Sequence, residues 1–189
     1  AECVLLYSGA DALLWRNLLA KAHAEGEVDT EVHEATLALL GHMERYCRNL
    51  VCRHGALSGY FGQELEGSCG ACDVCNDEVE GATDATVVAQ KMLSNIYRVR
   101  DRFGIGHLVE VLSGGDTDRV RRLGHDQVST YGLLKGTPRK QLTNWYYQLI
   151  DQGLIERSDG DYPTLSLNAA SMEVLRGDRK VQLLQIKVK

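Results

Sequence analysis

Five of the six cysteines in this 189-residue chain lie between residues 47 and 75, where their spacing could bind a metal ion. Cys52, Cys69, Cys72 and Cys75 follow the pattern C-x16-C-x2-C-x2-C. A CxxC turn lets two thiolates face one ion, with zinc–sulfur distances of about 2.3 Å. Cys52 would supply the fourth corner of a tetrahedron from a distant segment. Four thiolates leave no open coordination position, which is typical of a structural zinc site.

Other cysteine chemistries remain as alternatives. Reduced thiols or a redox pair would explain one CxxC motif, but they need no third and fourth partner. An iron–sulfur cluster also uses cysteines, although nothing else in the sequence indicates electron transfer. Cys47 and His54 compete as the fourth ligand. Cys3 lies in an apolar run, and we expect it to be a buried small hydrophobic residue.

The charge of the chain is divided unevenly along its length. The formal net charge is −5, and 44% of the residues are hydrophobic, which excludes a disordered tail or a fibre. Residues 1–81 carry 5 Lys+Arg against 14 Asp+Glu, and residues 82–189 carry 16 against 12. The basic half could bind DNA even though the whole chain is acidic. The split, together with the acidic linker 76–81, predicts a boundary near residue 80.

No apolar run approaches the roughly 20 residues that a membrane span needs, so we expect no membrane partner. The amino end has no basic segment followed by an apolar one, so no signal peptide is expected. A disulfide framework would need such a signal. The sequence therefore predicts a cytoplasmic protein.

Helical periodicity dominates the amino-terminal half. Cys3–Tyr7 reads as a short buried strand, which would make the chain a fragment of a larger sheet. We expect Asp11 to cap a helix that runs to about Ala24. Asp29 or Thr30 begins a second helix, and a third helical stretch covers Arg48 to Tyr60.

The carboxyl-terminal half predicts helices followed by a hairpin. Asp84 should cap a helix with an apolar stripe, and residues 107–112 are ambiguous between strand and helix. Thr137 as N-cap and Pro138 as first residue begin a helix whose core face is Leu142, Trp145, Tyr146, Leu149 and Ile150. Residues 154–157 and 163–167 read as two strands joined by a turn at 158–161.

These elements predict an α+β fold in which a mostly helical zinc-binding domain is followed by a winged-helix domain, a three-helix bundle with a short β-hairpin wing. The free face of the helix after Pro138 presents Arg139, Lys140, Thr143 and Asn144. Basic, amide and hydroxyl groups on one helix face can contact DNA phosphates and base edges. An ordinary solvated face is the alternative.

Several segments together resemble RecQ-family DNA helicases. The resemblance covers nearly the whole chain, in the family's order, and includes both its zinc-binding segment and its winged-helix domain. The segments that carry it are Arg45–Cys47, Gly59–Gly62, Cys69–Cys75, Arg102–Gly106, Gly124–Asp126 and Gln148–Ile155.

The resemblance implies an ATP-dependent enzyme that unwinds DNA in the 3′ to 5′ direction during repair, recombination and replication. The chain contains no G-x-x-x-x-G-K-[ST] loop, so ATP and Mg²⁺ would bind only in motor domains outside it. We therefore expect no activity from this fragment alone. The expected domains are residues 1–24 as the tail of the second motor domain, 25–81 as the helical zinc-binding domain with four cysteine ligands and 82–189 as the winged-helix domain.

The resemblance also places the zinc ligands on the four cysteines of the spacing argument and implies where DNA would bind. The expected DNA contacts come from the loop and turn around Arg119, the third helix and the wing: Thr117, Arg119, Arg122, Lys135, Arg139, Lys140, Thr143, Asn144 and Arg157. The wing is short and has no aromatic residue at its turn, which argues against strand separation by this hairpin. Residues 181–189 would lead toward a further module.

The implied partners are duplex and forked DNA, the motor domains in cis and the tail of a single-stranded-DNA-binding protein, in a bacterial nucleoid setting. Two other functions stay open. The first is a zinc and winged-helix transcription regulator, which would read a defined site as a dimer. The second is a docking module whose basic winged-helix surface receives an acidic partner tail.

Overall fold

The computed structural model describes residues 3–48, 50–100, 102–158 and 162–185. These residues form two compact units, one ending at Glu80 and the other beginning at Gly81. The predicted domain borders at residues 24 and 81 stay predictions. Among the helices of the described segments, none combines the length and the apolar character needed to span a membrane.

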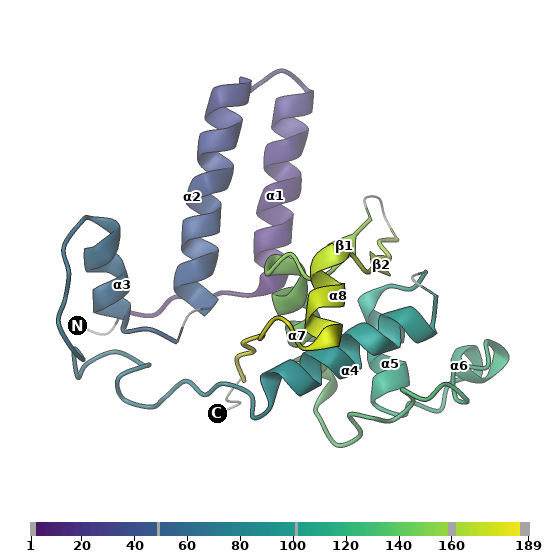
Figure 1. The fold of residues 1–189 in the computed structure, drawn as a ribbon. Coiled ribbons are helices and arrows are strands. Elements are labelled where there is room, and N and C mark those ends of the chain that lie inside the picture. Colours follow the sequence, from purple (N-terminus) through teal and green to yellow (C-terminus); the bar gives the residue numbers. More distant parts are fainter. Residues whose placement is uncertain (1–2, 49, 101, 159–161, 186–189) are drawn as a thin grey trace. The chain divides into compact units, whose positions relative to one another are not determined.

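The first unit contains the helices α1 (Gly9–Ala24), α2 (Thr30–Arg48) and α3 (Arg53–Tyr60), and α1 packs beside α2 (Figure 1). Ser8 begins α1 with a capping box in which its side chain accepts from the Asp11 N–H. Asp11 is thus the reciprocal partner in the box and not the N-cap, which corrects the prediction. Asp29 accepts from the Val32 N–H at 2.8 Å and caps α2 as expected.

An ion pair joins α1 to α2. Arg16 Nε and Nη2 donate to the two carboxylate oxygens of Glu44 at 3.0 and 2.6 Å, and Glu44 is only 2% exposed. Ala12 and Glu44 are the buried residues of this unit within the described segments, whereas apolar side chains such as Trp15 and Leu18 are exposed. The first unit therefore buries few apolar side chains, and polar contacts such as this ion pair must hold its helices together.

Three predictions for this unit are wrong. Cys3–Tyr7 forms no strand and Leu6 is 90% exposed, because no strand of the described residues pairs with this segment. Cys3 is likewise exposed and not buried. The predicted third helix is shorter than expected because Cys52 interrupts it and becomes the N-cap of α3.

The second unit is built on three helices, α4 (Ala85–Arg98), α5 (Ile105–Leu112) and α7 (Arg139–Asp151), with the short helix α6 (Asp118–Arg122) between the last two. Strand β1 (Glu156–Arg157) pairs antiparallel with β2 (Leu165–Ser166), and α8 (Ala169–Arg176) follows. This arrangement confirms the α+β prediction of a helical bundle with a short hairpin wing. Residues 159–161 of the predicted turn lie outside the described residues.

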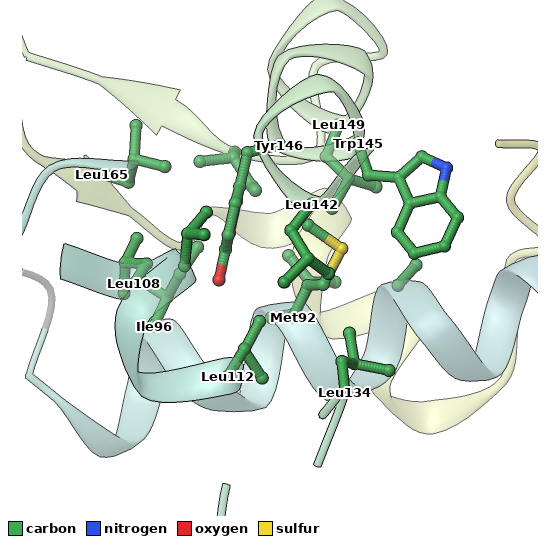
Figure 2. Packing of buried hydrophobic residues seen from close by; sticks show 14 of the residues in the cluster. Met92, Ile96, Leu108, Leu112, Leu134, Leu142, Trp145, Tyr146, Leu149 and Leu165 are labelled. Carbon is green, nitrogen blue, oxygen red and sulfur yellow. The ribbon is translucent and has the colours of Figure 1, made fainter. Parts of the chain in front are cut away.

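The core of the second unit lies where α4, α5 and α7 meet (Figure 2). Its largest fully buried side chain is Tyr146, whose hydroxyl accepts from Asn95 Nδ2 at 3.3 Å. The same Asn95 donates to the Leu108 carbonyl and accepts from the Thr130 hydroxyl, each at 3.0 Å. The predicted apolar faces of α4 and α7 are thus packed together around one satisfied polar group.

Several details of this unit differ from expectation. Residues 107–112 are helical, in α5. Asp84 occupies the N-cap position of α4 at φ 53°, but its side chain makes no cap hydrogen bond. Helix α7 begins one residue later than predicted, so Pro138 takes the N-cap position in place of Thr137. Helix ends commonly shift by this much because the first turn has no intrahelical partners.

The described part of the segment after α8 packs onto the second unit, which was not predicted, and its lead toward a further module stays a prediction. Val181 and Leu183 are buried in the core of the second unit. The Ala82 N–H donates to the Leu183 carbonyl at 2.7 Å, and Gly81 and Leu184 form an antiparallel bridge. Apolar residues at positions 181 and 183 alternate with exposed Gln182, the pattern of a half-buried extended segment.

Candidate metal centre and nucleic-acid interface

The four predicted cysteines converge in the first unit. Cys52 is the N-cap of α3, and the other three belong to the knuckle, defined here as residues 69–75. All four Sγ atoms lie within 4.8 Å of one another. Gly70 adopts φ 61°, a left-handed conformation that favours glycine and lets the first CxxC turn close.

Backbone N–H groups point at the sulfurs and hold them in place. Four N–H···S contacts, each of 3.4 Å, run from Gly55 to Cys52, from Arg53 and Cys75 to Cys72, and from Ala71 to Cys69. Hydrogen bonds to a sulfur favour its thiolate form, which is the form that binds metal. The first turn of α3 and the two turns of the knuckle thus supply the donors for one sulfur cluster.

The pKa values of the cysteines show which surroundings favour the thiolate form and which oppose it. The Gly55 N–H lowers the pKa of Cys52. Desolvation opposes ionisation of Cys72, but the N–H groups of Arg53 and Cys75 outweigh it, and the pKa of Cys72 is lowered.

Cys69 behaves differently. The Ala71 N–H favours its thiolate, yet desolvation and hydrogen bonds with the Cys52 and Cys72 thiols raise the pKa of Cys69 to about 11. Without a cation the coupled thiols of the cluster therefore retain a proton. A divalent ion would replace that proton and balance the crowded sulfurs, so the donor set fits zinc. Cys47 and His54, the competing ligands, lie outside the cluster.

An arginine next to the cluster, which sequence reasoning missed, ties three segments together. Arg53 Nε and Nη2 donate to the two Asp73 carboxylate oxygens at 2.8 and 3.1 Å, and Nη1 donates to the Tyr46 carbonyl. Its guanidinium carbon lies 5.5 Å from the centre of the Tyr46 ring. The hydrogen bond from Arg53 lowers the pKa of Asp73. Arg53 directly follows Cys52, and Asp73 directly follows Cys72. This adjacency to two cluster cysteines is the sequence signal that could have indicated the pair.

In the second unit, part of the predicted DNA-binding set lines one cavity of about 390 Å³ between α5, α6 and α7. Arg119 comes from α6, and Arg139 and Thr143 come from the first turns of α7. Gly106, His107, Val109 and Glu110 of α5 complete the lining. The structure thus brings two cations and a hydroxyl to one hollow.

Glu110 is the residue of this surface that the sequence analysis missed. Its carboxylate lies 3.9 Å from Arg139 Nη1 and accepts from the Thr117 hydroxyl at 3.4 Å. Thr117 also caps α6 by accepting from the Val120 N–H. The Thr143 hydroxyl donates to the Arg139 carbonyl. Both predicted threonines therefore have structural partners, and the carboxylate partly neutralises the positive charge of the cavity.

The rest of the predicted set does not line this cavity. Lys140 begins the outer face of α7, Lys135 precedes that helix and Arg122 ends α6, and all three are exposed. Asn144 of α7 and Arg157 of β1 are half-buried. The predicted DNA-binding residues thus cover a surface broader than the cavity, and the cations among them come from several elements.

An aromatic cluster lies behind Arg119. His107 Nε2 and His125 Nδ1 are 2.7 Å apart, and the Phe103 ring stacks on His107 with centroids 4.4 Å apart. The Arg119 guanidinium carbon lies 5.9 Å from the centre of the Phe103 ring. His107 is 6% exposed, and desolvation lowers its pKa to about 4. Neutral rings therefore join α5 to the segment after α6.

Each of the two units corresponds to a known protein family. The family model for the RQC domain matches residues 80–189, and the model for the RecQ zinc-binding domain matches residues 9–76. The chain is similar to proteins named ATP-dependent DNA helicase RecQ from Bacillus subtilis, Pasteurella multocida and Haemophilus influenzae, with 34%, 31% and 29% identity. These matches cover 96–97% of this chain but only 28–30% of those proteins.

The two matched models meet at the border between the two compact units. The sulfur cluster falls inside the RecQ zinc-binding match, and the cavity of α5, α6 and α7 falls inside the RQC match. The chain spans about three-tenths of the length of the relatives named above. Within it, a RecQ zinc-binding domain with one structural zinc precedes the RQC domain, and the chain therefore belongs to the RQC domain family of RecQ proteins.

Proposed function

We propose that this chain is the DNA-binding accessory region of a RecQ-type ATP-dependent DNA helicase that acts in repair, recombination and replication. In this proposal ATP and Mg²⁺ bind to motor domains in cis, and those domains move 3′ to 5′ along DNA. The observation that carries the proposal is the gathering of Arg119, Arg139 and Thr143 around one cavity of the RQC domain. We expect this chain alone to hydrolyse no ATP.

The zinc ligands in this proposal are Cys52, Cys69, Cys72 and Cys75. The proximity of their sulfurs and the four N–H···S contacts support the assignment. Bound zinc would hold the start of α3 against the knuckle, and it has no open position for catalysis. Its role is to fix the thinly packed first unit on which neighbouring domains would rest.

The DNA contacts in this proposal are made mainly to phosphates. The exposed Arg119, Arg122, Lys135, Arg139 and Lys140 would bind the backbone. Thr117, Thr143, Asn144 and Arg157 would assist from the edges of the same face. Phosphate contacts carry no sequence information, which suits an enzyme that must act on any sequence.

Two arginines of α6 provide a matched test of duplex binding. Arg119 lines the cavity, whereas Arg121 is ion-paired with Asp116 and Asp118. We expect Arg119→Gln to weaken binding of a mixed-sequence duplex about threefold to tenfold and to lower the salt slope by about one. Arg121→Gln should change binding little, because its charge is already neutralised. Equal effects of both variants would argue against a specific contact face.

Binding to random and selected duplexes separates this proposal from a transcription regulator. Mostly phosphate-directed binding predicts similar affinities for unrelated sequences at the same salt concentration. A strong preference for one defined site, together with a dimeric protein, would favour the regulator instead.

The same cavity could also receive an acidic peptide, such as the tail of a single-stranded-DNA-binding protein. Its concave shape and the pair Arg119 and Arg139 favour a carboxylate-bearing ligand. An acidic tail peptide that displaces duplex DNA from the chain would support this second candidate. No displacement at saturating peptide would oppose it. The cytoplasmic, nucleoid-associated location stays a prediction.

A further inference from the structure

We infer that Gln141 is a positioning residue for DNA binding, because it anchors the first turn of α7 to the extended segment Val181–Leu184. We name this segment the exit segment. The inference rests on the proposed function insofar as the first turns of α7 carry Arg139, Lys140 and Thr143 toward DNA. The described residues of the exit segment include none of the proposed DNA contacts.

One backbone carbonyl of the exit segment receives three side chains from α7. The Leu184 oxygen accepts from Gln141 Nε2 at 3.1 Å, Trp145 Nε1 at 2.9 Å and Gln148 Nε2 at 3.2 Å. The Leu184 N–H donates back to Gln148 Oε1 at 2.8 Å. Positions 141, 145 and 148 share one helix face, so a single point on the exit segment is bonded along two turns of α7.

The exit segment is itself held firmly enough to serve as an anchor. Val181 and Leu183 are buried in the core. The Val181 N–H donates to Thr86 Oγ1 at 3.1 Å, and the Leu183 carbonyl accepts from the Ala82 N–H at 2.7 Å. Both partners lie at the start of the second unit, so the anchor is tied to α4 as well as to α7.

Apart from the buried Leu142, the first turn of α7 has only weak restraints, so it needs this anchor. Pro138 occupies the N-cap position without a side-chain cap hydrogen bond. Arg139 and Lys140 are exposed, and the Arg139–Glu110 pair is long at 3.9 Å. Helix ends fray when their free N–H groups have no cap. Gln141 is the buried residue of this turn that ties it to the exit segment.

Loss of the anchor should therefore weaken DNA binding without a direct contact being removed. The dissociation constant rises by the factor by which the ordered first turn is depopulated. One neutral hydrogen bond changes the ordering equilibrium of the turn about fivefold, which lowers the affinity about threefold for a turn that is ordered about half of the time. We expect a loss of this size in Gln141→Met, which keeps the length of the side chain and removes its donor.

Gln152 offers a matched control on the same helix. Its Nε2 donates to the Gln182 carbonyl of the same exit segment at 2.9 Å, but at the carboxyl end of α7. In the full 189-residue chain, Gln141→Met and Gln152→Met are compared by duplex-binding titration. Hydrogen exchange is followed at the Thr143 and Asn144 amides, and the melting temperature of the second unit is measured.

The expected result is faster exchange at the Thr143 and Asn144 amides and about threefold weaker duplex binding in Gln141→Met alone, with little change in melting temperature. Unchanged exchange in Gln141→Met, or equal effects in Gln152→Met, would overturn the inference. If the wild-type chain binds no duplex at low salt, the proposed function fails, while the exchange comparison still decides whether Gln141 anchors this turn.

Discussion

Arg53 links the knuckle to the end of α2 beside the sulfur cluster. Its guanidinium binds Asp73 of the knuckle and the end of α2, while its own N–H donates to the Cys72 sulfur. Residues that orient metal ligands commonly affect metal affinity tenfold to a hundredfold when they are replaced. Arg53 therefore helps to hold the cysteine ligands in the positions in which they bind the metal.

Replacing Arg53 should loosen the metal without removing a ligand. We expect Arg53→Gln to release zinc to a chromophoric chelator about tenfold faster, because Asp73 loses both charge-assisted hydrogen bonds. Arg45→Gln is the control, since Arg45 is exposed and contacts His42. The same release rate in Arg53→Gln and wild type would show that the ion pair does not support the site.

The ligand assignment itself predicts different outcomes for Cys72 and Cys47. Cys72→Ser should lose stoichiometric zinc and expose the knuckle to protease, because zinc binding contributes to folding. Cys47→Ser should keep one zinc per chain. Elemental analysis and limited proteolysis of both variants check the assignment, and it would be wrong if Cys47→Ser, but not Cys72→Ser, lost the metal.

His107 makes the stability of the second unit depend on pH in a defined direction. Its pKa falls from 6.5 to about 4 in the folded chain because it is desolvated, so the unfolded chain binds the proton first on acidification. The contribution of His107 to the free energy of unfolding should thus be constant above about pH 6.5 and fall toward pH 4. His125, Arg119 and Asp126 are the charged or titratable groups that act on this histidine pair.

Urea unfolding at several pH values checks this direction. The slope between pH 6.5 and 4 should flatten in His107→Phe, which removes the titrating group and keeps an aromatic ring. His42→Phe, at an exposed position, should keep the slope. An unaltered slope in His107→Phe would assign the acid sensitivity to other groups.

At the scale of elements, the spacing of residues in the sequence predicted the features that are built within a single turn or helix. The CxxC turns of the cysteine cluster and the apolar face of α7 follow from spacing within one turn or one helix, and both were predicted. The Arg53–Asp73 pair joins residues 20 positions apart, so no periodic pattern revealed it. Glu110 was missed because its segment could not be assigned to helix or strand from the sequence.

The ends of elements were harder to predict than their existence. The expected third helix begins only after Cys52, because the Cys52 sulfur caps it by accepting from the Gly55 N–H, a contact that depends on the sulfur cluster. Helix α8 and the packing of the exit segment were not predicted, since both depend on burial against α4 and α7. Tertiary contacts rather than local propensity decided these segments.

At the scale of the whole molecule, the two units differ in what stabilises them and in the charge of their surfaces. The first unit has a thin core and relies on an ion pair and a sulfur cluster. The second has a continuous apolar core and carries the basic face. The charge split along the sequence, net −9 up to residue 81 and net +4 after it, follows the same division.

The most direct measurement is a titration of plain and forked duplexes with the wild-type chain, with zinc quantified in the same sample. We predict one zinc per chain and binding of both duplexes that weakens steadily as salt rises. A metal-free folded chain, or no binding of either duplex in dilute buffer, would contradict the account.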